Sequence, residues 1–197
     1  AAFAMAQKIS ALSLGDAALK KIGIRKGLPE TEDQALVYLF MASSSLSGDD
    51  YEKLLDDFIR QFPANADGYL RRANYYAAKG KDDQTWYDKA VADFNQALKV
   101  AQKKDDVYYN IGKLIYAYQL SKPEKTYKDW TYDTALQNVR QAIGIDPLPI
   151  YIQMEGDILF AQQDYAGALA AYEKVNASNI ASPATFFSAA KVTRKKS

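Results

Sequence analysis

Apolar positions recur along the chain at helical spacing, in segments that come in pairs. In three segments a large residue is followed by a small residue four positions later, and by a large residue three positions after that. They are residues 69–76, 108–115 and 152–159. Each is followed by a second segment with the same four- and three-residue spacing, at 90–97, 135–142 and 168–175. Residues three and four apart share one face of a helix, so the pattern predicts pairs of amphipathic helices and no sheet. A weaker copy of the pattern begins at Tyr38.

The distances between these segments indicate a repeat. The small residue of the first helix and the first apolar residue of the second lie 12 positions apart in the first and last copies, and 17 and 23 apart in the middle two. Removing the corresponding insertions of 5 and 11 residues leaves Ala73, Gly112 and Gly156 spaced by 34 and 33 positions. Two independent corrections therefore give nearly the same repeat length.

This pattern resembles the tetratricopeptide repeat (TPR) family, whose helices follow W-x2-L-G-x2-Y and A-x3-F with a period of about 34 residues. The resemblance covers about residues 34–190 and implies an all-α, right-handed solenoid of antiparallel helix pairs. It implies three clear repeats, one degenerate repeat and partial terminal units. Arg72 and Glu155 depart from the pattern, because they stand where it has aliphatic residues. Among family members, the chain resembles exported bacterial cell-envelope proteins.

The repeat pattern divides the chain into an N-terminal helical cap, residues 1–33, and an array, residues 34–197. The repeats are expected at about 34–64, 65–103, 105–147 and 149–181, followed by a partial repeat or cap helix at 183–197. Within the first segment, residues 1–6 resemble the end of a signal peptide, because Ala4-Met5-Ala6 fits the small-x-small cleavage rule. The alternative is that these alanine-rich residues form the first turn of a helix.

The two insertions each place a tryptophan shortly before a second helix, at Trp86 and Trp130. Charged turns of this kind lie on the surface of a protein. We interpret each tryptophan as a lid that packs over its own helix pair. The alternative is a contact with a ligand.

Composition narrows the classes of function. The chain has no histidine and no cysteine, so the commonest general base, the commonest metal ligand and all thiolate chemistry are excluded. Glu155 and Asp157 are the nearest acid pair on one predicted helix, and their spacing of two points them to different faces. No catalytic, cofactor-binding or metal-binding residues are therefore expected, and the chain is not expected to be an enzyme.

Charge and hydropathy limit the expected partners. The 25 basic and 24 acidic residues give a net charge of +1, without the surplus of cations that nucleic-acid binding needs. Only the last residues are basic without acids, at Lys191, Arg194, Lys195 and Lys196. No apolar stretch reaches the length of a membrane helix, so direct membrane insertion is not expected. A protein or peptide segment remains as the expected partner, with the oligomeric state left open.

The first helices of such repeats line a concave groove in the family. Counting one, five and eight positions from the first large residue of each first helix gives the candidate binding residues. We expect protein binding at Leu70, Asn74, Tyr109, Lys113, Tyr116, Gln153, Asp157 and Phe160. Aromatic residues dominate the binding energy of many interfaces, which favours Tyr109 and Tyr116. The alternative is that these two rings only cover neighbouring helices.

The carboxylate clamp of co-chaperone family members can be tested on the sequence. Asn74 and Asn110 match two of its positions, but Leu70, Ile150 and Met154 replace three of its cations. The resemblance therefore favours a non-catalytic scaffold or adaptor of the bacterial cell envelope, periplasmic or associated with the outer membrane. The alternatives are a cytosolic adaptor or co-chaperone, and an accessory domain of a larger enzyme.

Overall fold

A computed structural model describes residues 28–46, 48–80, 83–122, 124–125 and 127–177, together with residues 188 and 192. This described part contains eight α-helices and no strand, so the predicted all-α class is confirmed for it. None of these helices is long and apolar enough to cross a membrane. The predicted signal-peptide remnant, nearly all of the N-terminal cap and most of the segment 183–197 lie outside the described residues.

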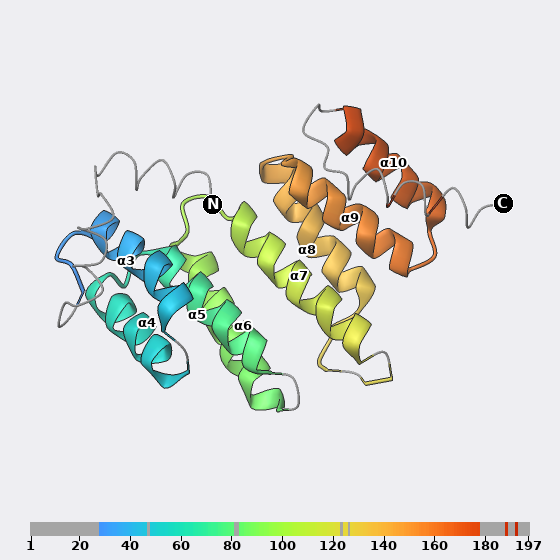
Figure 1. Cartoon of the computed structure of the whole chain (residues 1–197). Helices are drawn as coiled ribbons and strands as arrows, with labels where there is room; N and C mark the ends of the chain where they lie inside the picture. Colours follow the sequence, from blue (N-terminus) through green and yellow to red (C-terminus); the bar gives the residue numbers. More distant parts are fainter. Residues whose placement is uncertain are drawn as a thin grey trace. The chain divides into compact units, whose positions relative to one another are not determined.

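The chain divides into two compact units, residues 1–101 and residues 102–197. In unit 1, each described helix packs against the next one along the chain (Figure 1). Leu39, Leu55 and Phe58 are fully buried where the first two of these helices meet. The helices of unit 1 are α3 (Glu32–Ser45), α4 (Asp49–Gln61), α5 (Ala66–Lys79) and α6 (Gln84–Val100).

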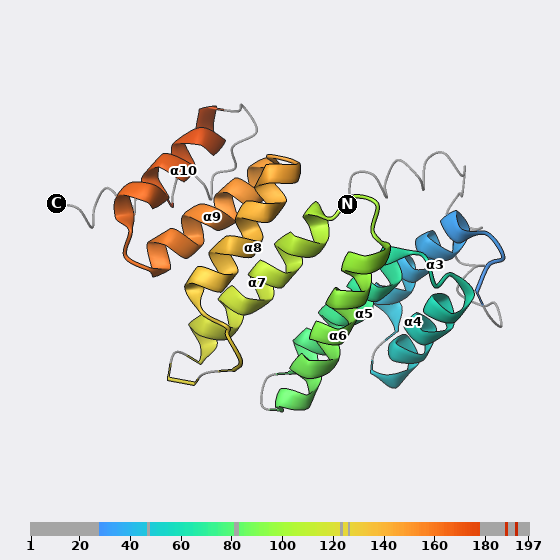
Figure 2. The same ribbon diagram turned by 180° about the vertical axis from the view of Figure 1, so that it is seen from behind.

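Unit 2 has the same organisation, and one further contact links its first and third helices. Consecutive helices again pack against each other, and α7 also reaches α9 directly (Figures 1 and 2). Val139, Tyr151 and Ile158 are fully buried between them. The helices of unit 2 are α7 (Asp105–Ser121), α8 (Tyr132–Ile145), α9 (Pro149–Ala161) and α10 (Tyr165–Ala177). Each predicted repeat range contains one pair of helices, in the order α3–α4, α5–α6, α7–α8 and α9–α10.

Side-chain caps explain where several helices begin. The side chain of Asn65 accepts a hydrogen bond from the Asp67 backbone N–H at 2.8 Å, at the start of α5. Asp83 caps α6 and Thr131 caps α8 in the same way. The first N–H groups of a helix have no partner within the helix, so such caps stabilise its start by about 1 kcal/mol each. The polar residues between the apolar segments therefore fix the helix boundaries.

Small residues let the two helices of a pair approach closely. A Cβ atom added to Gly112 of α7 would lie 2.7 Å from Cγ2 of Val139 and 2.8 Å from the backbone oxygen of Ala135, both on α8. A Cβ atom on Gly156 of α9 would lie 2.5 Å from the ring of Tyr172 on α10. Contacts this short do not occur between carbon atoms in folded proteins. The small residue of the repeat pattern thus lets the paired helices pack closely at both glycines.

Arg72 and Glu155, which depart from the family pattern, form ion pairs with adjacent helices. The guanidinium of Arg72 on α5 donates from Nε and Nη2 to the nearly buried carboxylate of Asp93 on α6, at 2.8 and 2.7 Å. It also donates to Asp56 on α4 at 2.6 Å. Glu155 on α9 accepts a hydrogen bond from Arg140 of α8 at 2.7 Å. At these two positions, ion pairs link adjacent helices where the family pattern has an aliphatic side chain that would link them by apolar packing.

Trp130 packs over its own helix pair. Its side chain is buried and lies against the rings of Tyr118 and Tyr127, with centroids 5.3 and 4.6 Å away. Tyr118 belongs to α7, and Tyr127 belongs to the inserted turn. The interpretation of this tryptophan as a lid is therefore supported.

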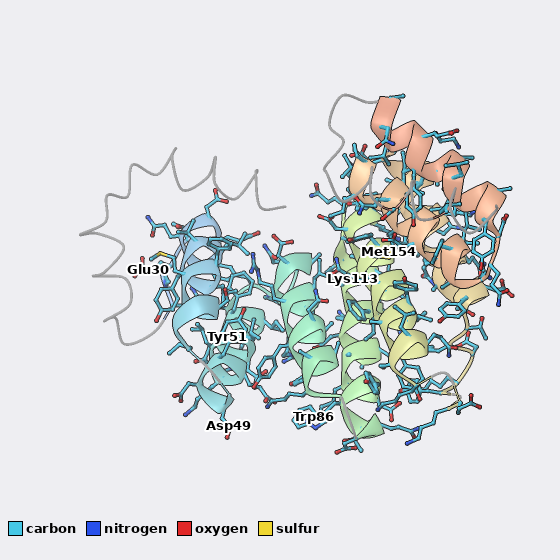
Figure 3. The ribbon with its side chains drawn as sticks, turned by 45° about the vertical axis from the view of Figure 1, so that its right-hand side comes forward. Glu30, Asp49, Tyr51, Trp86, Lys113 and Met154 are labelled. Atoms are coloured by element: carbon cyan, nitrogen blue, oxygen red, sulfur yellow. The ribbon has the colours of Figure 1, made fainter. Side chains whose placement is uncertain are left out.

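Trp86 has the same role at the α5–α6 turn, where it stands in the first turn of α6 (Figure 3). Its ring centroid lies 5.7 Å from that of Tyr76 on α5. The ammonium groups of Lys79 and Lys89 lie 4.5 and 4.4 Å from the Trp86 ring centroid, within the range of a cation–π interaction. The tryptophan thus closes the end of its own helix pair.

The close approach at Gly112 gives a first prediction. We expect Gly112→Ala to lower the free energy of unfolding by about 1–3 kcal/mol, because the added methyl group meets the backbone of α8 and cannot be relieved by rotating a side chain. Gly144→Ala is the matched control, since a Cβ atom there meets nothing within 4 Å. It should leave stability unchanged or raise it by up to about 1 kcal/mol, through higher helix propensity. Urea denaturation followed by circular dichroism measures both, and equal effects would contradict the packing role.

Candidate protein-binding face

The eight candidate binding residues lie on three helices. Leu70 and Asn74 are on α5 in unit 1, and the other six are on α7 and α9 in unit 2. None of the eight is buried. Since α7 and α9 are in contact, we treat these six as one candidate surface, which we call the α7–α9 face. Its residues are Tyr109, Lys113, Tyr116, Gln153, Asp157 and Phe160, and Lys113 is labelled in Figure 3.

The two tyrosines of α7 are partly buried and partly exposed. The ring of Tyr109 packs on that of Tyr151 from α9, with centroids 4.8 Å apart. The ring of Tyr116 lies 6.1 Å from that of Tyr132, at the start of α8. Each ring therefore covers a neighbouring helix and still contributes to the surface. Covering a helix and contacting a partner, the two alternatives from the sequence, do not exclude each other.

Asp157 is the most unusual charged group of the face. Its Oδ1 accepts a hydrogen bond from the hydroxyl of Tyr172 on α10 at 2.7 Å. No lysine or arginine among the described residues forms an ion pair with it, although the carboxylate is partly buried. Burial raises the pKa of Asp157 above its usual value, and the hydrogen bond from Tyr172 offsets only part of that effect. The surroundings of this carboxylate therefore disfavour its charged form.

The charge of Asp157 reaches both tyrosines of α7. Burial raises the pKa of the Tyr116 hydroxyl to about 12, with a further contribution from the negative charge of Asp157. The pKa of Tyr109 is raised by the same two causes, and the carboxylate of Asp106 adds to them. Asp157 thus lies close enough to both tyrosines to act on them, and Asp106 is close enough to act on Tyr109.

Asp106, in the first turn of α7, is a second carboxylate beside the face. It accepts a hydrogen bond from the hydroxyl of Tyr151 at 2.6 Å, and no cation in the described part of the chain pairs with it. Its neighbour Asp105 is nearly buried and does have a cation, Lys103, at 3.4 Å. Asp157 on the face and Asp106 beside it are therefore carboxylates that tyrosine hydroxyls hold in place and that no basic side chain among the described residues neutralises.

The adjacent acid Glu155 differs from Asp157 in having a cationic partner. Glu155 points to Arg140 on α8, and Asp157 points to Tyr172 on α10. The expectation that these two acids lie on different helix faces is confirmed. They do not form the carboxylate pair that general acid–base catalysis would use.

The two asparagines that match the co-chaperone clamp both bond to their own helices. The amide nitrogen of Asn74 donates to the backbone oxygen of Leu70 at 3.0 Å, and that of Asn110 donates to the backbone oxygen of Asp106 at 2.7 Å. These donors satisfy local backbone acceptors. Asn74 and Leu70 remain surface positions of unit 1, separate from the six residues on unit 2.

Sequence reasoning missed three residues that shape the face. Tyr172 is one of the apolar positions in the second helical segment at 168–175, but its hydroxyl holds Asp157. Tyr151 supports the ring of Tyr109 and holds Asp106. Asp106 stands three residues before Tyr109, so helical spacing could have placed it on the same face of α7.

A separate hollow lies on the surface of α8, and it contains none of the candidate residues. Its lining combines one apolar side chain with charged and amide groups, two of which already have partners on α9 and its C-terminal end. Arg140 pairs with Glu155, and Asp133 accepts a hydrogen bond from Gln162 at 2.6 Å. The lining residues are Asp133, Leu136, Gln137, Arg140 and Gln141. It is less suited to binding a protein segment than the α7–α9 face, because its lining contains no aromatic side chain.

The environment of Asp157 gives a second prediction. Because its pKa is raised in the folded state, ionisation of this group destabilises the fold as the pH rises from the unfolded-state value of about 4 through the folded-state value. Asp157→Asn keeps an oxygen that can accept from Tyr172 and removes the charge. The melting temperature at pH 7 should therefore rise, and the difference from the unmodified protein should vanish near pH 3.

Thermal melts of both proteins between pH 3 and pH 8 test this expectation. Glu173→Gln, which removes an exposed charge from α10, should show no such trend. A lower melting temperature for Asp157→Asn at pH 7 would contradict the assigned cost of the buried charge.

No protein-family model matches the chain, and no curated protein is similar to it at a significant level. The α7–α9 face and the repeat pattern are therefore the observations from which a function is inferred.

Proposed function

We propose that this chain is a non-catalytic, TPR-type interaction module that binds a segment of another protein on the α7–α9 face. In this role it acts as an adaptor or scaffold. The observation that carries the proposal is the partly buried Asp157. It accepts a hydrogen bond from the buried Tyr172, its charge acts on the partly exposed Tyr109 and Tyr116, and it lacks a cationic partner in the described part of the chain.

Ordinary packing gives no reason for such a group. A charge in a partly desolvated position costs free energy unless a partner compensates it. Residues that reduce stability in this way are concentrated at functional sites, where their interaction with a ligand compensates for the cost. Partly exposed tyrosines add the amphipathic contact area that is enriched at the centres of protein interfaces. A surface with a partly desolvated charge and partly exposed tyrosines is better suited to contact with a protein segment than to exposure to solvent.

The repeat pattern supports the TPR-type part of the proposal. Each predicted repeat range holds one helix pair, and Gly112 and Gly156 make the close contacts expected of the small residue in that family. Repeats of this kind stack through neighbouring pairs and present extended surfaces to partner proteins. A right-handed array of the four pairs is the arrangement that we propose.

The non-catalytic part of the proposal rests on the residue types that the chain has. The sequence has no histidine and no cysteine, and the acids near the face are held singly by tyrosine hydroxyls. The raised pKa of Asp157 has a physical cause in burial, so it does not require a catalytic role. A carboxylate among tyrosines is suited to holding a partner's cation by electrostatic attraction.

We place this module in the bacterial cell envelope, because Ala4-Met5-Ala6 has the form of a signal-peptidase site. If this proposal holds, the mature protein purified from its own source should begin at Gln7. Edman degradation or mass spectrometry of the N-terminal peptide measures this directly. A cytoplasmic pool that retains residues 1–6 would contradict the location without affecting the binding proposal.

The binding proposal gives a fourth prediction. Tyr109→Ala combined with Tyr116→Ala should weaken partner binding by about 2 kcal/mol or more, because truncation of central aromatic side chains commonly costs that much. The immobilised protein is incubated with lysate from its source, and recovered proteins are compared by quantitative mass spectrometry. A partner should be enriched by the unmodified protein and lost from the double variant.

The control for this experiment changes another surface of the same unit. Gln137→Ala with Gln141→Ala alters two exposed residues at the hollow on α8, and it should leave recovery of the partner unchanged. A melting curve confirms that the tyrosine variant is folded. Equal recovery by a folded double-tyrosine variant would mean that the α7–α9 face is not the binding site.

A further inference from the structure

We propose that the segment bound on the α7–α9 face presents a lysine or arginine side chain, whose cation lies between Tyr109 and Tyr116 against the carboxylate of Asp157. This inference rests on the proposed function and names the chemistry of its partner. It does not follow from the TPR resemblance, which would favour a clamp of cations around a partner's carboxylates.

Charge complementarity is the first argument. Asp157 and Asp106 each accept one hydrogen bond from a tyrosine hydroxyl, at 2.7 and 2.6 Å, and neither has a cation among the described residues. By contrast, Asp105 pairs with Lys103 and Glu155 pairs with Arg140. Among the described residues, Asp157 and the adjacent Asp106 thus lack the cation that Asp105 and Glu155 have. A basic side chain from the partner would compensate for the desolvation of Asp157.

The arrangement of aromatic rings is the second argument. Tyr109 and Tyr116 are seven residues apart on α7, and the exposed Lys113 stands between them on the same face. Both rings remain partly exposed, whereas Tyr172, whose hydroxyl donates to Asp157, is buried. Ring faces attract cations, and the attraction increases where water is excluded. Two partly exposed tyrosines beside one carboxylate are therefore chemically suited to an ammonium or guanidinium group and unsuited to an anion.

Lys113 is the one basic residue of the face. Replacing it tests whether the face prefers a cationic or an anionic partner. It is exposed on α7 and forms no ion pair with Asp157. If the partner contributes a cation, removing Lys113 should strengthen binding modestly, by relief of like-charge repulsion. If the partner contributed an anion, removing Lys113 should weaken binding and removing the charge of Asp157 should strengthen it.

Other occupants of the face are conceivable, and the experiment separates them. The chain's own basic residues Arg194, Lys195 and Lys196 lie outside the described residues, and Ser188 forms a side-chain hydrogen bond with Tyr172. A second copy of the chain would bring the same basic residues. We favour a separate protein, because Tyr109 and Tyr116 remain partly exposed on the surface of the unit.

The test begins by incorporating the photo-crosslinking residue p-benzoylphenylalanine at position 113 of the full chain. This position is exposed, and its replacement leaves Tyr109, Tyr116 and Asp157 intact. After irradiation in cells of the source, the crosslinked segment is identified by mass spectrometry and synthesised as a peptide. Its affinity for the purified protein is then measured by isothermal titration calorimetry.

The expected result is a crosslink to a segment of another protein that contains a lysine or arginine. Replacing that basic residue by glutamine in the peptide should weaken binding at least about tenfold, and Asp157→Asn in the protein should weaken it to a similar extent. The two changes together should be no worse than either alone. Glu173→Gln should leave the affinity unchanged, and Lys113→Ala should raise it about two- to threefold.

The possible failures are distinguishable. A segment without a basic residue, or a peptide whose affinity does not respond to Asp157→Asn, would overturn the cation proposal and leave the binding function intact. A crosslink to residues 189–197 of the same chain, or to a second copy, would overturn the choice of a separate partner. No crosslink to any protein, with unchanged recovery in the lysate experiment, would refute the binding function itself.

Discussion

The close approach of paired helices at glycine is the constraint on which unit 2 depends. At Gly156 the absence of a side chain lets the ring of Tyr172 lie directly on the backbone of α9. That position of the ring brings its hydroxyl within 2.7 Å of the carboxylate of Asp157, the residue that follows Gly156. The contact that packs α10 against α9 thus also orients the central carboxylate of the candidate site. A side chain at position 156 would move the ring and the hydroxyl together, so the packing and the site cannot be altered independently.

Two acids on α9 differ in whether a cation on an adjacent helix pairs with them. Glu155 replaces an aliphatic residue of the repeat pattern, and Arg140 of α8 compensates for it. In unit 1, Arg72 likewise replaces an aliphatic residue and is matched by Asp93 and Asp56. Charged groups in the helix interfaces therefore come with partners on adjacent helices, as expected from the cost of leaving them unpaired. Asp157 has no oppositely charged partner among the described residues, which is why we regard it as a functional group rather than a packing residue.

The sequence predicted the helices and their pairing well, because both depend on local spacing. Periods of three and four define a helix face, and small residues at Gly112 and Gly156 mark where the second helix packs. It predicted the site less completely, because spacing within one helix carries no information about distances between helices. Tyr172 was expected only in the core, since its ring is apolar, although its hydroxyl reaches the surface group Asp157. Likewise, no local pattern indicates that Tyr151 would support Tyr109 and hold Asp106.

Binding and stability should be coupled in unit 2, because the same tyrosines serve both. Tyrosine has an apolar ring and a polar tip, so Tyr109 can pack on Tyr151 and still offer a surface to a partner. A cation placed beside Asp157 would lower the pKa of this carboxylate, which burial raises in the free protein. The partner would thereby remove a cost of folding, and any ligand that binds only the folded state stabilises it further. Without a bound cation, unit 2 would then be less stable than with one, and the proposed partner would supply the compensating charge.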